Sequence, residues 1–70
     1  MEKSSFTLTA EFIELFELLK VTGLCESGGV AKHAISQSEV RVDGLVETRK
    51  ACKIRKGQQV EFGGETILVM

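Results

Sequence analysis

The order of hydrophobic and polar positions along the chain predicts a helix in its first third. Over residues 10–21 the apolar positions recur at three- and four-residue spacing, which is the period of one face of a helix. Thr9 is the expected N-cap, and Gly23 is expected to end the helix in a left-handed conformation. Residues 5–9 alternate between polar and apolar and can form a short strand, whereas residues 1–5 are expected to be frayed or disordered.

A second helix is predicted for residues 27–37. Ser27 is a suitable N-cap, and the apolar positions that follow recur with helical spacing on one narrow face. The small alanines on this face allow a close approach to the first helix. The face consists of Val30, Ala31, Ala34 and Ile35.

Two hairpins are predicted for the rest of the chain. The first turns at Asp43-Gly44, a dipeptide that favours tight turns because both positions tolerate positive φ. A strict two-residue turn would place Arg41 opposite Val46 and mix polar with apolar side chains on one face. We therefore expect a longer loop or a bulge at this position.

The second hairpin is predicted to turn at Gly63-Gly64. A two-residue turn there pairs Phe62 with Glu65 and puts the apolar side chains of both strands on the face that packs against the helices. The predicted fold is therefore α+β, with two short packed helices followed by a small, mostly antiparallel sheet of two hairpins and the option of an N-terminal strand. The apolar side chains that share the face are Val60, Phe62, Ile67 and Val69.

Length and composition set the class of protein. Seventy residues with 43% hydrophobic content are expected to form one domain, residues 1–70, with little room for a deep pocket. No apolar run is long enough to cross a bilayer, and the N-terminus lacks the apolar core of a signal peptide, so we expect a cytoplasmic protein. A cytoplasmic setting favours free thiols at Cys25 and Cys52. Two scattered cysteines and one histidine do not form a zinc site, and no cofactor is expected.

The basic residues are concentrated in one segment. The net charge is −1, but residues 1–26 carry two bases and five acids, whereas residues 27–70 carry seven bases and five acids. Local field, rather than net charge, steers a polyanion toward a protein. The segment 49–56 contains no acid and predicts a polyanion-binding surface. Its bases are Arg49, Lys50, Lys53, Arg55 and Lys56.

No catalytic constellation is visible in the sequence. His33 has no partner at a catalytic spacing, and no serine has a base at a recognisable spacing, so we do not expect an enzyme. The sequence Ser27-Gly28-Gly29 with Lys32 one turn later fits an ordinary helix cap and an anion site equally well.

The aromatic residues indicate which kind of polyanion the chain is expected to bind. The chain has no Trp and no Tyr, and its four phenylalanines all fall on predicted core faces. Proteins that bind single strands usually stack bases on exposed aromatic side chains. We therefore expect this chain to bind structured RNA through its shape and its phosphates. The phenylalanines are Phe6, Phe12, Phe16 and Phe62.

Two short helices followed by V-x-V-D-G-x-V and I-x-x-G-x-x-V-x-F resemble a known family, the small alpha-L RNA-binding domain named after ribosomal small-subunit protein S-four. The resemblance covers roughly residues 12–62, and the string E-T-R-K-A-C-K-I at residues 47–54 is similar to the short stand-alone bacterial members of the YbcJ type. It implies a bacterial, ribosome-associated module in translation that binds ribosomal or transfer RNA. The matching residues are Leu15, Leu18, Ser27, Ala31, Ile35, Val40, Val42, Asp43, Gly44, Val46, Ile54, Gly57, Val60 and Phe62.

The resemblance also implies a contact surface formed by the second helix and the hairpin. This surface includes Ser27, Lys32, Arg41, Asp43, Gly44, Arg49 and Lys50, and charge alone adds Lys53, Arg55 and Lys56.

The chain departs from the family pattern at two basic positions. Many members have Arg-Leu-Asp where this chain has Ile13-Glu14-Leu15, and they commonly have Arg where this chain has Gly28. Either RNA affinity is modest or the contact has moved onto residues 49–56.

A second function is also compatible with the charge pattern. The acidic first helix and the near-zero net charge favour a protein-interaction adaptor on a ribosome-associated or enzyme complex. Under both interpretations we expect a monomer.

Overall fold

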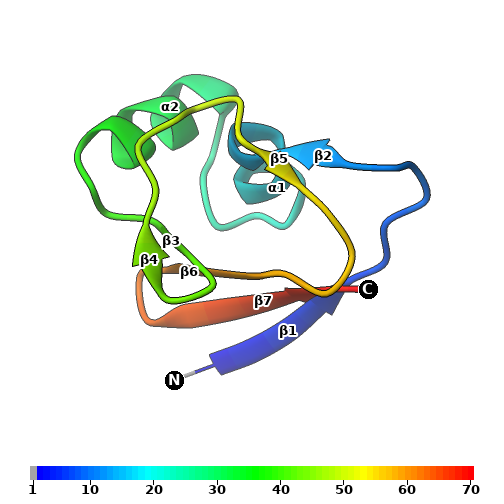
Figure 1. Cartoon of the computed structure of the whole chain (residues 1–70). Coiled ribbons are helices and arrows are strands. Elements are labelled where there is room, and N and C mark those ends of the chain that lie inside the picture. The colour runs from blue at the N-terminus through cyan, green and yellow to red at the C-terminus, as the bar shows by residue number, and fades with distance from the viewer. Residues whose placement is uncertain (1) are drawn as a thin grey trace.

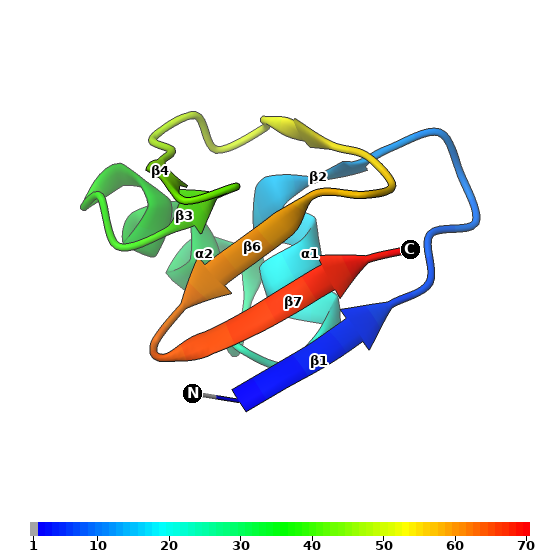
Figure 2. The ribbon, with the colours of Figure 1, turned by 60° about the horizontal axis from the view of Figure 1, so that its bottom comes forward.

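The computed structural model describes residues 2–70 and arranges them in two layers, with two helices on one face of a sheet (Figure 1). The sheet has five strands in the order β1-β7-β6-β3-β4, and only the β1–β7 pair is parallel. Figure 2 shows the sheet in front of the helices. This architecture confirms the predicted α+β class. The elements of these layers are β1 (Glu2–Phe6), α1 (Leu15–Val21), α2 (Gly28–Ser36), β3 (Arg41–Val42), β4 (Leu45–Val46), β6 (Gln59–Phe62) and β7 (Glu65–Val69).

A separate two-stranded ribbon lies beside α1 and was not predicted. It consists of β2 (Ile13–Glu14) and β5 (Lys53–Ile54), which pair antiparallel with Ile13 opposite Ile54. The ribbon matters for function because β5 holds the middle of the basic segment.

The first helix is shorter than predicted. The sequence pattern suggested residues 10–21 with Thr9 as the N-cap, but α1 begins at Leu15 after Glu14, whose side chain makes no cap hydrogen bond. The pattern failed because Ile13 pairs with Ile54 in the ribbon instead of joining the helix. The C-terminal end agrees with the prediction, since Gly23 has a φ of 81°.

The second helix agrees closely with its prediction. The side-chain oxygen of Ser27 accepts a hydrogen bond from the Val30 amide at 3.2 Å, as an N-cap does. Ala31, Ala34 and Ile35 are buried against the rest of the molecule, whereas Val30 remains exposed.

The first hairpin has a strict two-residue turn, so the expected longer loop or bulge was wrong. Asp43 and Gly44 both have positive φ, 52° and 84°, as a type I′ turn requires. Arg41 lies opposite Val46, and the mixed pairing is tolerated because β4 is an edge strand whose side chains face solvent.

The second hairpin and the N-terminal strand complete the sheet. The Gly63-Gly64 turn pairs Phe62 with Glu65 as predicted. The N-terminal strand spans Glu2–Phe6 instead of residues 5–9, so residues 2–5 are not frayed but paired with β7. Residue 1 lies outside the described residues.

One hydrophobic core joins the sheet to the helices. Leu15, Leu18 and Leu19 of α1 are fully buried against apolar residues of α2 and the sheet. Ile54 is also fully buried, so the ribbon is anchored in the same core. Burial of one such aliphatic side chain stabilises the fold by about 1.5–3 kcal/mol.

Candidate nucleic-acid interface

The basic segment is held against the N-terminal end of α1 by backbone hydrogen bonds. The Leu15 amide donates to the Cys52 carbonyl at 2.9 Å, and the Phe16 amide donates to the Lys50 carbonyl at 3.2 Å. These carbonyls satisfy amides at the start of α1 that would otherwise lack helical partners. Together with the buried Ile54, they give residues 50–54 a defined backbone position.

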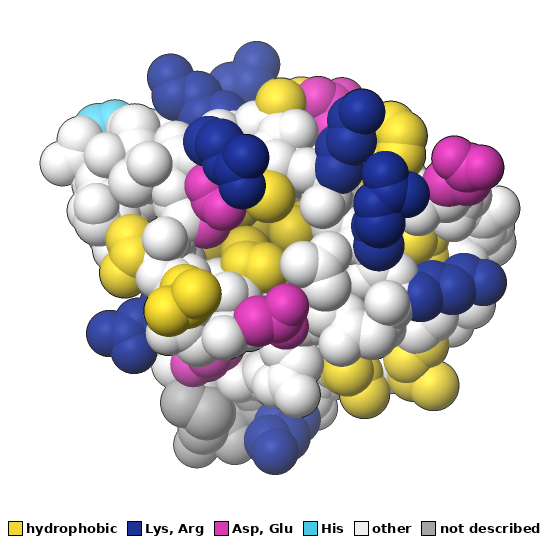
Figure 3. All heavy atoms as spheres, in the orientation of Figure 1, with side chains coloured by type: hydrophobic (Ala, Val, Ile, Leu, Met, Phe, Trp, Pro, Cys, Tyr) yellow, Lys and Arg dark blue, Asp and Glu magenta, His cyan; other side chains and the backbone are white. Residues whose placement is uncertain are grey.

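Five basic side chains on and beside this segment are exposed. Among the residues that the structure describes, none of the five has a carboxylate within ion-pair distance. Figure 3 shows the dark-blue side chains gathered over the segment that runs from β4 through β5. We call this set the basic face, and it consists of Lys32, Lys50, Lys53, Arg55 and Lys56.

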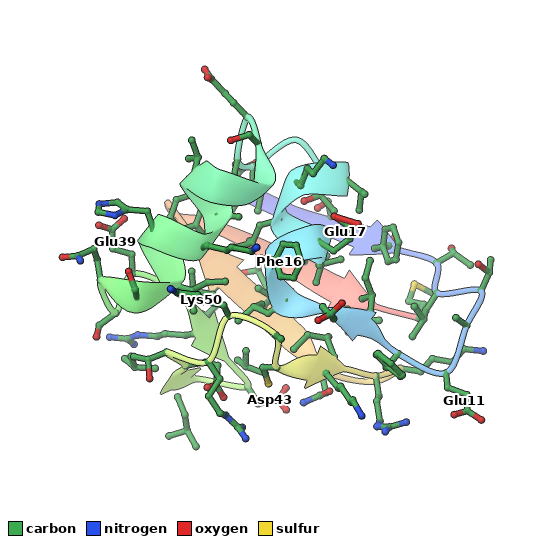
Figure 4. All side chains as sticks on the ribbon, turned by 90° about the horizontal axis from the view of Figure 1, so that it is seen from above. Glu11, Phe16, Glu17, Glu39, Asp43 and Lys50 are labelled. Carbon is green, nitrogen blue, oxygen red and sulfur yellow. The ribbon has the colours of Figure 1, made fainter. Side chains whose placement is uncertain are left out.

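Lys32 joins the basic face from α2. Its Nζ atom lies 4.6 Å from the centroid of the Phe16 ring, and Phe16 bonds through its amide to the Lys50 carbonyl. Figure 4 shows Phe16 between the two helices, with Lys50 on the side of α2. Phe16 therefore links Lys32 of the second helix to the backbone of the basic segment.

Arg49 is engaged within the protein. Its Nε and Nη2 atoms donate to the two carboxylate oxygens of Glu47 at 3.0 and 3.1 Å, and its amide donates to the same carboxylate at 2.9 Å. These hydrogen bonds lower the pKa of Glu47 to about 2 and raise the pKa of Arg49. Arg49 therefore offers less free charge to a ligand than its place in the sequence suggested.

Asp43 connects the first hairpin to the loop that follows β5. Its carboxylate accepts hydrogen bonds from the Gln59 amide at 2.9 Å and from the Gln58 side-chain amide at 3.4 Å. Gln58 in turn accepts from the Arg55 amide at 2.7 Å. The Asp43-Gly44 turn thus positions the backbone at Arg55, and the exposed Asp43 carboxylate is engaged by hydrogen bonds within the protein.

Arg41 lies apart from the basic face. Val42 points into the core, so Arg41 points to the opposite side of the sheet. There it lines a surface hollow together with three acidic residues and the Gly63-Gly64 turn. We call this hollow the acidic pocket, and its charged residues are Glu39, Arg41, Glu61 and Glu65.

Ser27 has a structural role that the hydrogen bond to Val30 demonstrates. A role for Ser27 in anion binding stays a prediction.

Phe12 was missed as a candidate functional residue. The sequence placed all four phenylalanines on core faces, and Phe6, Phe16 and Phe62 do pack against the buried cluster. Within residues 2–70, Phe12 does not belong to the side chains packed on this cluster, although it is partly covered. Phe12 could have been recognised only from the pairing of β2 with β5, which places residue 12 beside the basic strand.

The two cysteines are free thiols, as predicted. Cys25 is buried and Cys52 is half-buried, and burial raises the pKa of each thiol. Within the described part of the chain, no group of three or more His, Cys, Asp or Glu side chains is placed to hold a metal ion. None of the helices in residues 2–70 is both long and apolar enough to cross a membrane.

The fold and the basic face together define a small α+β binding domain whose cations lie on an ordered loop and on the second helix. The chain belongs to the S4 domain family, whose model matches residues 6–70. The resemblance inferred from the sequence motifs is therefore confirmed.

Two relatives and one solved structure support this assignment. The chain is 53% identical over 58 residues to Escherichia coli (strain K12) YbcJ, provisionally named an RNA-binding protein, with 83% of each chain covered. It is 34% identical over 58 residues to Bacillus subtilis (strain 168) RlbA, provisionally named a ribosome maturation protein, covering 83% of this chain and 82% of the relative.

The solution structure of Escherichia coli YbcJ matches with a TM-score of 0.73 at 49% identity, covering 94% of this chain and 85% of that one. That structure was described as having an alpha-L motif involved in RNA binding. The expectation of similarity to YbcJ-type proteins is thus confirmed as well.

Proposed function

We propose that this protein is a non-catalytic module that binds structured RNA through the basic face. The observation that carries the proposal is the set of five exposed cations without carboxylate partners among the described residues. Four are lysines, which engage phosphates as point charges, and phosphate contacts position a protein on RNA without reading sequence.

The anchored backbone supports this role. Lys53 and Arg55 flank the fully buried Ile54 and therefore both project away from the core. Because the ribbon and the α1 amides hold this segment, little backbone ordering accompanies binding. A preformed array of charges suits the fixed phosphate spacing of folded RNA better than a flexible single strand.

Ribosomal RNA is the first candidate ligand and transfer RNA the second. The name of YbcJ points to RNA, and the name of RlbA points to ribosome maturation. A protein of this kind acts in the cytoplasm, where ribosomes assemble. Crosslinking of the intact protein to RNA in cells, followed by sequencing of the bound fragments, identifies which RNA it contacts.

A salt titration tests the proposal directly. Binding of the protein to a labelled ribosomal RNA hairpin is measured by fluorescence anisotropy at several salt concentrations. If five phosphates are engaged, log affinity falls against log salt with a slope of about −3.5 to −4.5. Binding that is undetectable at low salt, or insensitive to salt, contradicts the proposal.

A second candidate function is a protein-interaction adaptor. It is favoured by the free edge of β4, where Leu45 and Val46 are 75% and 51% exposed. Exposed edge strands are ready to pair with another chain. The double variant Leu45→Thr and Val46→Thr keeps RNA affinity under the RNA-binding proposal, whereas loss of a co-purifying protein partner from this variant favours the adaptor.

A further inference from the structure

Phe12 sits beneath two cations of the basic face. The Nζ atom of Lys53 lies 4.9 Å from the centroid of the Phe12 ring, and the Cζ atom of Arg55 lies 5.7 Å from it. Both distances are within the range of cation–π attraction. The ring is partly covered but, among the described residues, does not belong to the set packed on the core.

The register of the ribbon explains this placement. Ile13 pairs with Ile54 and Glu14 with Lys53, so continuation of the ladder puts Phe12 opposite Arg55. Ile13 and Ile54 turn toward the core, and alternation therefore turns Phe12 outward with Lys53 and Arg55. The aromatic ring and the two cations form one outward-facing cluster on the ribbon.

Phe12 differs from Phe16 in its relation to the core. Phe16 also has a cation over its ring, Lys32 at 4.6 Å, but it packs against the buried cluster. Figure 4 shows Phe16 between the two helices. Phe16 is therefore part of the scaffold, whereas the ring of Phe12 lies under the exposed side chains of Lys53 and Arg55.

We propose that Phe12 stacks an unpaired base of the bound RNA while Lys53 and Arg55 engage the flanking phosphates. This inference rests on the proposed function and deepens it. Exposed cation–π contacts are weaker than the stacking of a base on an aromatic ring. Charge-assisted contacts to phosphate are also strong, so the two cations leave the ring for phosphates when RNA binds.

The proposal specifies the class of RNA. A base inside a continuous duplex is stacked on its neighbours and has no free face for Phe12. The preferred ligand is a folded RNA in which an unpaired base interrupts or ends a helix, so that phosphates and a free base lie together. The chain is still expected to bind structured RNA by shape and phosphate contacts, and the proposal adds the stacking of one unpaired base on Phe12.

Two RNA hairpins test the proposal. They share the same stem, and one of them carries a single unpaired adenosine in the middle of it. The intact protein is expected to bind the bulged hairpin about 5- to 100-fold more tightly than the fully paired one. Phe12→Leu is expected to remove this preference while leaving affinity for the paired hairpin unchanged, and Phe12→Trp is expected to retain it.

Phe62→Leu is the matched control, because Phe62 is a partly buried phenylalanine beside the acidic pocket. It is expected to leave the preference for the bulged hairpin intact. Equal binding of both hairpins by the unmodified protein, or equal weakening of both by Phe12→Leu, overturns the stacking proposal but leaves phosphate binding standing. Absence of binding to either hairpin contradicts the proposed function itself, and the stacking proposal with it.

Discussion

The basic face and the acidic pocket both contain cations that the sequence singled out, yet the fold gives them opposite surroundings. Among the described residues, no carboxylate lies within ion-pair distance of the basic face or of Arg41, so the contrast lies in the acids that line each surface. In the acidic pocket, Arg41 shares a hollow with Glu39, Glu61 and Glu65, which come from three different parts of the chain. Glu14 lies opposite Lys53 in the ribbon, so the two surfaces differ in how many acids the topology brings beside the cations, and three acids surround the single cation Arg41.

The comparison of the two surfaces also suggests which residues of the first hairpin support the fold and which are placed to contact RNA. Arg41 and Asp43 were both predicted to touch RNA, but Arg41 faces the acidic pocket and Asp43 holds the loop before β6. The contact is expected to lie with the cations of the basic face, and the hairpin is expected to fix their position.

The largest effect is expected from removing the anchor of the basic face. Ile54→Ala deletes a fully buried side chain and is expected to reduce the free energy of unfolding by about 2–5 kcal/mol. Urea denaturation measures this loss. Ile54→Val keeps the protein folded for comparison, with an expected loss of about 0.5–1.5 kcal/mol. A loss below about 1 kcal/mol for Ile54→Ala would show that the ribbon is not anchored in the core.

Charge reversal tests whether the basic face and the acidic pocket differ in RNA binding. The triple variant Lys50→Glu, Lys53→Glu and Lys56→Glu is expected to weaken RNA binding at least about 100-fold at low salt and to flatten the salt slope by about 2 to 3. Arg41→Glu is the matched control in the acidic pocket and is expected to change affinity less than about 2-fold. If both variants lose the same amount of RNA affinity, as measured by fluorescence anisotropy, the two surfaces do not differ in RNA binding.

Removal of the Asp43 carboxylate tests its role as scaffold. Asp43→Ala loses the hydrogen bonds to Gln58 and Gln59 and is expected to destabilise the fold by about 1–2 kcal/mol. Asp43→Asn keeps an acceptor and tolerates the φ of 52°, so it is expected to lose less. Thermal unfolding compares the two. If Asp43→Ala weakens RNA binding without changing stability, Asp43 is a contact residue.

The smallest effect is expected from releasing Arg49. Glu47→Gln removes the carboxylate that holds the guanidinium, and the freed charge is expected to raise RNA affinity about 2- to 5-fold. The pKa of Glu47 is lowered from 4.5 to about 2, so its contribution to stability is present above pH 4.5 and is lost as pH falls toward 2. The variant is therefore expected to show a flatter loss of stability over this pH range, and an unchanged acid profile would contradict the assignment.

The sequence predicted those elements whose signals are local. The cap at Ser27, the left-handed Gly23 and the Gly63-Gly64 turn each depend on a few neighbouring residues, and the structure has all three. Ser38, just after α2, has a φ of 62°, the conformation that glycine adopts most readily.

Apart from the bulge expected in the first hairpin, which was a local error, the errors concern pairings between distant segments. The periodicity of residues 10–21 could not reveal that Ile13 would pair with Ile54, and this pairing shortened α1 and placed the partly covered Phe12 beside β5. The alternation in residues 5–9 likewise could not reveal that residues 2–6 would pair in parallel with β7. The candidate site had the same limit, because two of the three acids around Arg41, Glu61 and Glu65, come from the distant strands β6 and β7.

A nuclear magnetic resonance titration tests most directly which surface binds RNA. Amide spectra of the isotopically labelled protein are recorded while a ribosomal RNA hairpin is added. We predict that the signals of residues 50–57 and those around Lys32 shift or broaden, while the signals of Arg41 and residues 61–65 stay in place. Changes concentrated around Arg41 and the Gly63-Gly64 turn, with the basic face unaffected, would contradict this account.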